Sequence, residues 1–239
     1  MLKSIIIQPT FIPWLGYFDL IDQSDICVYL DHVQFDYRSW QHKNKIKDAS
    51  QKELLLTVPV KNGETKQKLK DVLIQNDTNY TKKHINSIFF NYKKCKYFDE
   101  IFPEIKKILN KKYTHLTELN YNFINYFCKY LKINSNFIKS SSLSTSKNKD
   151  ELILEILGII ESSNYYSPAG SIDYLKKNKK FNEKKINIFF QEYECKKYNQ
   201  LHGDFIDHLS TLDLIMNEGP KSKQIILSGR KYKKYDFSK

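Results

Sequence analysis

The chain has 239 residues, of which 41% are hydrophobic and 14% aromatic, so it is long enough to bury a core of its own. It has no apolar run that could cross a bilayer and no charged-then-apolar leader, so we expect a soluble, cytoplasmic protein. Its formal net charge is +12, but Arg38 and Arg230 are its only arginines, and lysine lacks the planar fork that clamps phosphates and reads base edges.

The cysteines are scattered along the chain and show no paired spacing typical of a metal site: Cys27, Cys95, Cys128 and Cys195. We interpret them as buried thiols in a reducing compartment. The chain also lacks an HExxH motif, a paired CxxC and a P-loop. The sequence therefore predicts no metal site and no cofactor.

The first predicted elements surround a bend that is bracketed by two prolines. Ile5–Ile7 is a β-branched run typical of a buried strand, and Pro13 suits the first turn of a helix. After Pro13, four apolar residues fall on one helical face: Leu15, Phe18, Leu20 and Ile21. Asp25–Leu30 is then predicted to form a second strand. In an open α/β sheet, ligands bind in the loop that leaves the carboxyl end of such a strand.

The middle of the chain is predicted to hold a loop, a hairpin and three helices. Residues 31–46 are polar and aromatic and fit no simple period, so we expect a long ordered loop there. Two β-prone runs, 54–60 and 70–75, flank the polar stretch 62–68 and predict a hairpin. Three consecutive helices should follow over roughly residues 77–132 as a helical insertion, with a cap at Asp77-Thr78 and later helices over 98–111 and 116–131.

The second half alternates predicted strands with predicted helices, which is typical of a mostly parallel sheet. The strands are expected at 136–139, 164–167 and 186–191, and the helices at 150–160, 168–175 and 204–217. The lysine-rich tail from about residue 229 is expected to fray. No low-complexity linker divides the chain. We therefore predict one α/β domain over residues 1–239, with a mostly parallel Rossmann-like sheet, a β-hairpin and an inserted helical subdomain.

The first candidate site group follows the first predicted strand and comprises Gln8, Pro9, Thr10, Trp14 and Tyr17. A strand followed by P-x-x-G-aromatic resembles the strand–H-x-G-H turn of nucleotidylyltransferases, in which a helix N-terminus holds phosphate. Trp14 and Tyr17 stand where that family has its histidines. The pattern favours an anion-binding turn and argues against histidine-assisted adenylyl transfer. An aromatic-lined turn that simply packs on the helix remains the alternative.

A second group lies after the second predicted strand. Asp31 leaves that strand at its carboxyl end, where a carboxylate would act as a general base or hold a sugar hydroxyl. Cationic side chains in the same loop would grip a phosphate or a carboxylate. The remaining candidate binding residues of this group are Gln34, Arg38, Trp40, Lys43, Asn44 and Lys45. A surface loop with satisfied polar groups would explain the same residues.

Two further groups come from the second half. Ser167 and Gly170 belong to a strand-to-helix turn whose small residues would let a ligand approach the backbone. Gln200, His208 and Asp213 lie in and before the last predicted helix, and a histidine that stands alone on a helix is more often structural than catalytic. The same holds for His84, which lies on the stripe of the first inserted helix.

Together these segments resemble the WbqC-like protein family. The resemblance depends on five stretches, which cover nearly the whole chain in order: Gln8–Tyr17, Leu30–Phe35, Thr57–Val60, Tyr166–Gly170 and His208–Leu214. Members are similar to components of bacterial surface-polysaccharide gene clusters, including O-antigen and lipopolysaccharide loci. The resemblance therefore implies work on a nucleotide-linked or lipid-linked sugar and suggests amino-sugar modification.

Two functional hypotheses follow. The first is a transferase that adds an acyl or aminoacyl group to a nucleotide-linked amino sugar, with Asp31 as the base, His84 or His208 as the alternate base, and Lys43, Lys45 and Ser167 holding pyrophosphate. The second is a non-catalytic scaffold or an RNA-associated module that uses the lysine-rich surface. A tRNA-dependent aminoacyl transferase would unite the two. The sequence also allows a homo-oligomer and does not specify the donor.

Overall fold

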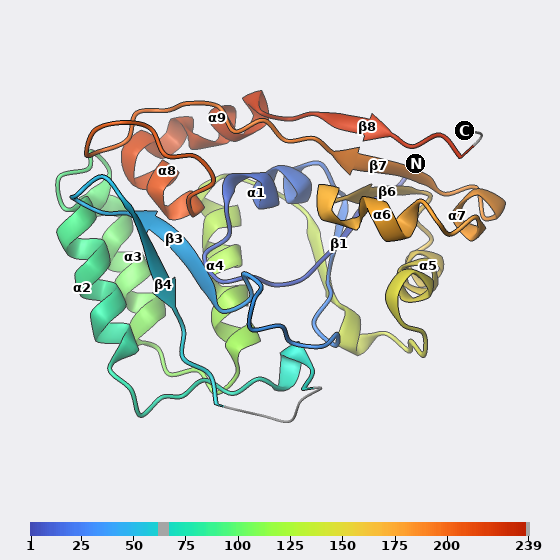
Figure 1. Ribbon diagram of the computed structural model, residues 1–239, viewed down its shortest axis with the longest axis horizontal. Helices are drawn as coiled ribbons and strands as arrows, with labels where there is room; N and C mark the ends of the chain where they lie inside the picture. The colour runs from blue at the N-terminus through green and yellow to red at the C-terminus, as the bar shows by residue number, and fades with distance from the viewer. Residues whose placement is uncertain (62–66, 238–239) are drawn as a thin grey trace.

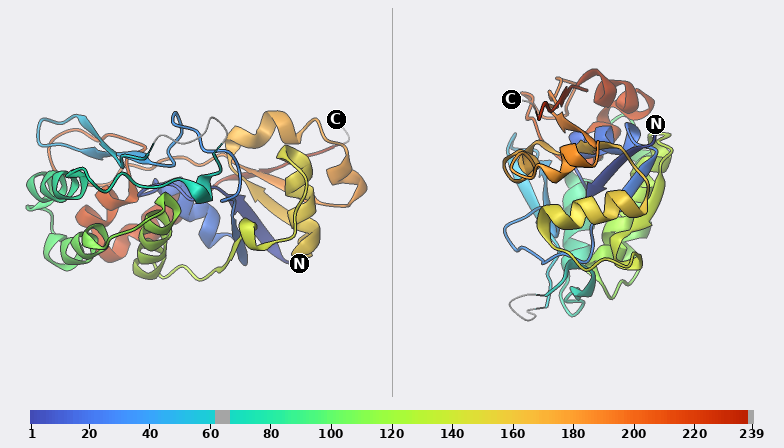
Figure 2. Two further views of the ribbon diagram at one scale, coloured as in Figure 1. Left: turned by 90° about the horizontal axis from the view of Figure 1, so that it is seen from below. Right: turned by 90° about the vertical axis from the view of Figure 1, so that its right-hand side faces the viewer.

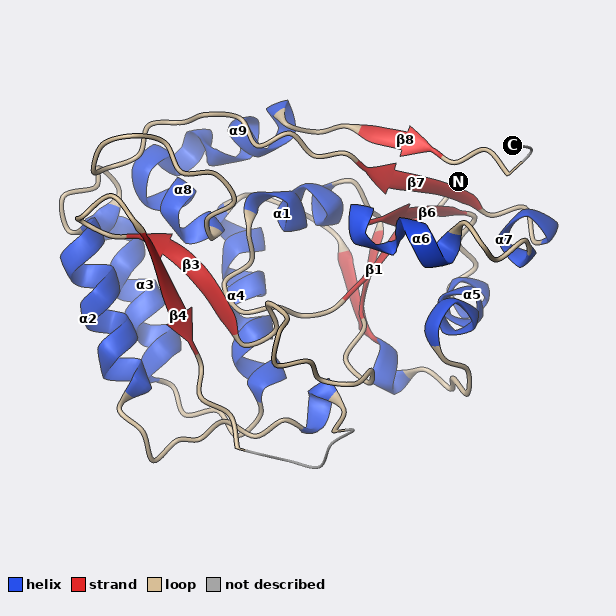
Figure 3. Cartoon of the chain, in the orientation of Figure 1, coloured by secondary structure: helices blue, strands red, loops and turns tan. Residues whose placement is uncertain are grey.

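The computed structural model describes residues 1–61 and 67–237, so most of the predicted hairpin turn lies outside the described residues. A six-stranded sheet has the order β5-β2-β1-β6-β7-β8, and β3 and β4 form a separate antiparallel hairpin (Figure 3). All neighbours in the large sheet are parallel except β7 and β8. The predicted α/β class with a mostly parallel sheet is confirmed. The strands are β1 Lys3–Ile7, β2 Ile26–Tyr29, β3 Lys43–Lys47, β4 Glu53–Thr57, β5 Asn136–Lys139, β6 Asn164–Ser167, β7 Asn187–Gln191 and β8 Tyr232–Lys234.

The helices α2 and α3 and the β3–β4 hairpin lie at one end of the molecule, and α5, α6 and α7 lie at the other (Figures 1 and 2). None of the helices in the described part of the chain combines the length and the apolarity that crossing a bilayer requires. The helices are α1 Leu15–Asp22, α2 Tyr80–Tyr92, α3 Phe98–Asn110, α4 Leu116–Tyr130, α5 Lys149–Ile159, α6 Ile172–Leu175, α7 Lys180–Glu183, α8 Thr211–Glu218 and α9 Ser222–Ser228.

The large sheet separates two hydrophobic cores. Successive residues of a strand point to opposite faces, so Ile5 and Ile6 of β1 enter different cores. Ile5 joins the buried residues of α1 and α4, including Phe18 and Phe127. Ile6 joins those of α5, including Leu157. Helices therefore cover both faces of the sheet, as burial of a parallel sheet requires.

The direction in which the chain winds reverses between β1 and β6. From β1 the chain builds outward through β2 to β5, and it then places β6 against the other edge of β1. The β3–β4 hairpin and helices α2–α4 occupy the crossover between β2 and β5. Open α/β sheets bind ligands in the crevice outside the carboxyl ends of the strands at such a reversal. The fold thus points to the ends of β1 and β6.

The predicted hairpin between 54–60 and 70–75 is wrong. The strand Glu53–Thr57 pairs with Lys43–Lys47, which belongs to the segment predicted as loop. The tight turn between them is held by Asp48, whose carboxylate accepts hydrogen bonds from Ser50 N–H and Lys52 N–H. The sequence KNKIK gives no strand signal, because four of its five residues are polar although Asn44 and Lys47 are buried in the structure. The two predicted strands meet only through a bridge between Val60 and Ile74.

The predicted helix over 204–217 is also shorter than expected, because α8 begins at Thr211. His208 has a φ of 54°, which a right-handed helix does not allow. Ser210 then caps the helix, and its side chain accepts a hydrogen bond from Leu212 N–H. His208 therefore lies in a loop, and the interpretation of it as a helical histidine is wrong.

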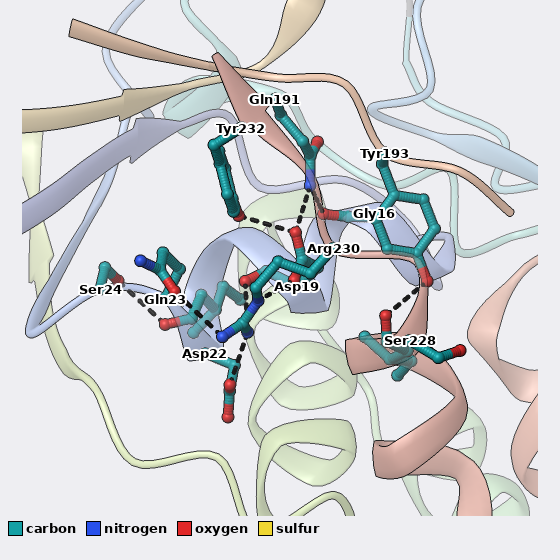
Figure 4. A network of polar contacts seen from close by, with 12 residues as sticks. Gly16, Asp19, Asp22, Gln23, Ser24, Gln191, Tyr193, Ser228, Arg230 and Tyr232 are labelled. Atoms are coloured by element: carbon teal, nitrogen blue, oxygen red, sulfur yellow. Dashed lines mark hydrogen bonds and ion pairs between the residues drawn. The ribbon is translucent and has the colours of Figure 1, made fainter. Parts of the chain in front are cut away.

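The tail does not fray as predicted, because β8 pairs antiparallel with β7 and Arg230 ties the tail to α1. Arg230 Nε donates to Asp19 Oδ1 at 2.6 Å, and an Nη donates to Asp22 Oδ2 at 2.7 Å (Figure 4). Tyr232 Oη and Gln191 Nε2 donate to the other oxygen of Asp19, which is fully buried. The sequence shows an Arg-Lys-Tyr run, but its partners are some 200 residues away.

Candidate functional site

A cavity of about 680 Å³ opens at the carboxyl ends of β1 and β6, where the winding of the sheet reverses. Nine of the predicted site residues line it: Gln8, Thr10, Trp14, Tyr17, Trp40, Asn44, Lys45, Gly170 and His208. The sequence interpretation missed seven others: Ile6, Ile7, Leu30, Ile153, Tyr165, Pro168 and Ser171. The residues come from strands β1, β3 and β6, from helices α1 and α5, and from the loops and turns that connect the elements. Distant segments of the chain therefore meet at one site.

Two buried asparagines hold the bend after β1 in place. Asn44 Nδ2 donates to the carbonyl oxygens of Phe11 and Ile12, at 3.2 and 2.9 Å. Asn120 of α4 donates from Nδ2 to Pro9 O at 3.1 Å and to Gln41 O at 2.8 Å. The bend needs this support because Ile12 has a φ of 36°, a strained value for a β-branched residue. The carbonyl group of Pro9 thus anchors the backbone of the bend, and Pro9 does not line the cavity.

Aromatic side chains form one wall of the cavity. The rings of Trp14 and His208 stack with their centroids 5.1 Å apart and 23° between their planes, and Tyr193 meets Trp14 edge-on. Across the site, Lys45 Nζ lies 5.6 Å from the ring centroid of the exposed Trp40. Flat aromatic faces of this kind suit stacking on a sugar or a base.

Gly16 explains how the indole of Trp14 fits its place. A Cβ at Gly16 would lie 2.4 Å from Cη2 and Cζ2 of Trp14, closer than any real contact. We therefore expect Gly16→Ala to push the indole out of its stack with His208. The measurement is a red shift of Trp14 fluorescence in a Trp40→Phe background.

A matched control for that prediction is Gly158→Ala, because a Cβ at this α5 glycine meets nothing within 4 Å. This control should leave the emission unchanged and raise the free energy of unfolding by about 0.5–1 kcal/mol, since alanine is the better helix former. An unshifted emission in Gly16→Ala would contradict the packing described for Trp14.

Several polar groups of the lining already have hydrogen-bond or ion-pair partners within the protein. Tyr17 Oη donates to Gln8 O at 3.2 Å, and burial raises the pKa of Tyr17 well above its ordinary value, so it stays neutral. Lys45 Nζ forms an ion pair with Glu53 Oε2 at 2.7 Å, which compensates its charge. Gln8 Oε1 accepts from Gln41 Nε2 at 2.7 Å. The lining therefore offers neutral donors more than free positive charge.

Asp31, the predicted general base, lies at the end of β2 but not in the cavity lining. Its buried carboxylate accepts hydrogen bonds from Tyr121 Oη, Ser140 Oγ, and both the N–H and the Oγ of Ser141, at 2.8–3.0 Å. These bonds join β2 to α4 and to the serine turn after β5. Asp31 therefore links these elements, and the four hydrogen bonds occupy the carboxylate oxygens that would have to accept a substrate proton.

His84, the predicted alternate base, is 5% exposed on α2 and packs against Phe11 of the bend. Burial lowers its pKa to about 4, although a hydrogen bond with the Thr57 backbone opposes the shift. It does not line the cavity. His84 is therefore placed as a neutral core residue behind the bend.

This burial makes a prediction about pH. Because the folded-state pKa of about 4 lies below the ordinary 6.5, the unfolded chain binds the proton first as the pH falls. Lowering the pH from 7 to 5 should therefore reduce the free energy of unfolding through His84 by about 2 kcal/mol. Urea unfolding at both pH values, compared with His84→Leu, measures this contribution. An equal loss in the variant would contradict it.

His208 is the histidine that faces the cavity. Its Nδ1 lies 3.2 Å from Asp207 Oδ1, and both side chains are exposed. No residue in the described part of the chain bonds to its Nε2. An aspartate that holds Nδ1–H leaves Nε2 as the proton acceptor. His208 thus has the geometry of a base, which Asp31 and His84 lack.

The remaining predicted residues lie away from the cavity. Ser167 is buried beneath it, where its Oγ bonds to Tyr165 Oη and to Ser171 Oγ, and Ser171 reaches the lining instead. Lys43 Nζ donates to Tyr37 O. Asp213 accepts hydrogen bonds from two tyrosine hydroxyls, and burial raises its pKa. The other three outside the lining are Gln34, Arg38 and Gln200.

Within residues 1–61 and 67–237, no three His, Cys, Asp or Glu side chains are grouped so that they could hold a metal ion.

The seven lining residues that the sequence analysis did not name are mostly apolar. Six of the seven lie in or just after strands β1, β2 and β6, and Ile153 lies on α5, so a search for polar residues does not detect them. Gln41 and Asn120 support the site from behind and carry no motif.

Comparison with known proteins places nearly the whole chain in one family. The model of the WbqC-like protein family matches residues 8–225. The chain is also similar to the uncharacterized protein Rv1507c of Mycobacterium tuberculosis, with 32% identity over 225 residues, covering 93% of this chain and 96% of that protein. No solved structure matches the chain. The protein therefore belongs to the WbqC-like protein family.

Proposed function

We propose that the protein is a transferase that adds an acyl or aminoacyl group to the amine of a nucleotide-linked amino sugar in surface-polysaccharide biosynthesis. The observation that carries this proposal is the aromatic-walled cavity of about 680 Å³ at the winding reversal of a doubly wound sheet. The surface-polysaccharide context implied by the family resemblance suggests the substrate. The cavity volume suits a nucleotide sugar in part or whole.

In this proposal His208 replaces Asp31 and His84 as the base. The amine nitrogen attacks the carbonyl carbon of an activated ester donor, the new C–N bond forms, and the bond to the leaving group breaks. The amine proton passes to Nε2 of His208, while Asp207 holds Nδ1–H. Trp14 and Trp40 provide the stacking faces for the sugar or base.

Calorimetric titration with a panel of nucleotide-linked amino sugars tests the binding step. Trp14→Ala should weaken binding by about fivefold to 150-fold, because stacking of one base on an aromatic side chain contributes about 1–3 kcal/mol. Phe90→Ala, which removes an exposed aromatic on α2 outside the lining, should not change the affinity.

Wild-type protein that binds none of the panel would contradict the proposal. Mass spectrometry of a bound nucleotide sugar, incubated with protein and activated acyl or aminoacyl donors, then tests transfer. The expected product carries the added acyl mass on the sugar amine. Binding that weakens steeply with salt for any polyanion, equally in Trp14→Ala, would favour the lysine-rich scaffold instead.

A further inference from the structure

The lining contains two side-chain amides, and only one of them keeps a donor for a ligand. Asn44 uses Nδ2 for the carbonyls of Phe11 and Ile12 and uses Oδ1 for Lys45 N–H, so its hydrogen-bonding groups are occupied. Gln8 uses Oε1 for Gln41. In the described part of the chain, no acceptor is bonded to Gln8 Nε2. Gln8 therefore offers an –NH₂ group at the cavity.

The orientation of that amide follows from a backbone group. Asp36 N–H can only donate, so the Gln41 side-chain atom 3.0 Å away must be Oε1. Gln41 Nε2 is then the atom 2.7 Å from Gln8, and a donor there requires Gln8 to turn its oxygen toward it. Gln41 is 1% exposed, so water does not compete for these bonds. The chain from Asp36 through Gln41 leaves Gln8 Nε2 as the outward group.

We propose that Gln41 is a positioning residue that fixes Gln8 as a hydrogen-bond donor, and that the cavity selects a ligand with an acceptor oxygen at this point. Under the proposed function, on which this assignment rests, that oxygen belongs to the diphosphate. The ion pair between Lys45 and Glu53 agrees with this assignment. Because Glu53 compensates the charge of Lys45, neutral hydrogen-bond donors such as Gln8 Nε2 are left to bind the anion. Thr10, two residues further along the bend, also lines the cavity and has a hydroxyl that can donate a hydrogen bond.

Gln41→Glu tests the assignment by reversing the amide. One glutamate oxygen still accepts from Asp36 N–H, and the other then faces Gln8 and forces it to donate there and to turn Oε1 toward the cavity. In calorimetry, the affinity for UDP-glucosamine, whose amine is free, should fall by about tenfold to a hundredfold, because a hydrogen bond to a charged oxygen is lost. Uridine, which has no phosphate, should keep its affinity. Gln75→Glu adds the same charge outside the cavity and should change neither affinity.

A second background separates the reversed amide from simple charge repulsion. In Gln8→Leu, the change Gln41→Glu should add little further loss, because no amide remains to turn. An equal loss in both backgrounds would show repulsion alone and would overturn the assignment. Gln41→Met adds no charge; it frees the Gln8 amide and removes the acceptor of Asp36 N–H. Gln41→Met should therefore reduce the affinity for the nucleotide sugar less than Gln41→Glu does. An unchanged affinity in Gln41→Met would contradict the positioning role of Gln41.

Nuclear magnetic resonance reads the orientation without any ligand. In wild type, the side-chain –NH₂ protons of Gln8 should exchange quickly with water and those of Gln41 slowly. In Gln41→Glu, the Gln8 protons should become slow. Equal exchange in both proteins would overturn the role of Gln41. If the orientation reverses but no nucleotide sugar binds wild type, the proposed function and the diphosphate assignment fail while the positioning role stands.

Discussion

Replacing Arg230 with alanine is expected to lower the free energy of unfolding by about 3–5 kcal/mol, because it leaves the buried Asp19 carboxylate without its cationic partner. Gln191 and Tyr232 still donate to Asp19 but cannot neutralise it. The loss should be visible as a lower urea midpoint with an unchanged slope. The network also holds α1, from which Tyr17 lines the cavity.

The matched control is the only other arginine of the chain. Arg38 is exposed, and its backbone N–H bonds to Asp36, so Arg38→Ala should change the unfolding free energy by no more than about 0.5 kcal/mol. Equal effects of the two substitutions would show that the tail contributes nothing beyond ordinary surface contacts. That result would restore the prediction of a fraying tail.

Asn120→Leu is expected to destabilise the protein by about 1–3 kcal/mol for each of two carbonyls, because Pro9 O and Gln41 O lose their shared donor while staying buried. Leucine has nearly the same size, so the change removes hydrogen bonds more than volume. The bend should also loosen, and the affinity for nucleotide sugars should fall with the stability. Urea unfolding and calorimetry on the same variant measure both effects.

Asn122→Leu provides the comparison on the same helix. Asn122 Nδ2 donates to Glu118 O one turn earlier and touches neither the bend nor the loop before β3. We expect this variant to lose less than about 1 kcal/mol and to keep its affinity. If Asn120→Leu behaved like Asn122→Leu, the described anchoring of the bend would be wrong.

The parts of the fold that could be predicted from the sequence are those with local signals. The strands Asn136–Lys139 and Asn164–Ser167 have the predicted bounds, because short apolar runs there are flanked by turn residues. The hairpin failed because the polar-looking strand Lys43–Lys47 has a buried lysine whose Nζ bonds to Asp204 O. That contact joins residues far apart in sequence, and no local pattern encodes it.

In the candidate site, too, the features with local sequence signals could be predicted and those set by distant contacts could not. The bend and its aromatic residues could be found because strand, prolines and indole lie within a dozen residues. A carboxylate at a strand end suits a base, so the sequence favours Asp31, but four hydrogen bonds from α4 and the serine turn occupy its oxygens. The loop position of His208 could not be predicted, because the positive φ that excludes it from the helix is not visible in the sequence.

A crystal structure of the protein with UDP-glucosamine, whose amine is free, is the most direct test of where this molecule binds its ligand. We predict the diphosphate beside Gln8 and Thr10, and a ring of the ligand against Trp14 or Trp40, at the carboxyl ends of β1 and β6. Density for the nucleotide in the cavity between α3 and α4, which Glu100 and Tyr126 line, with nothing beside Gln8, would contradict the account.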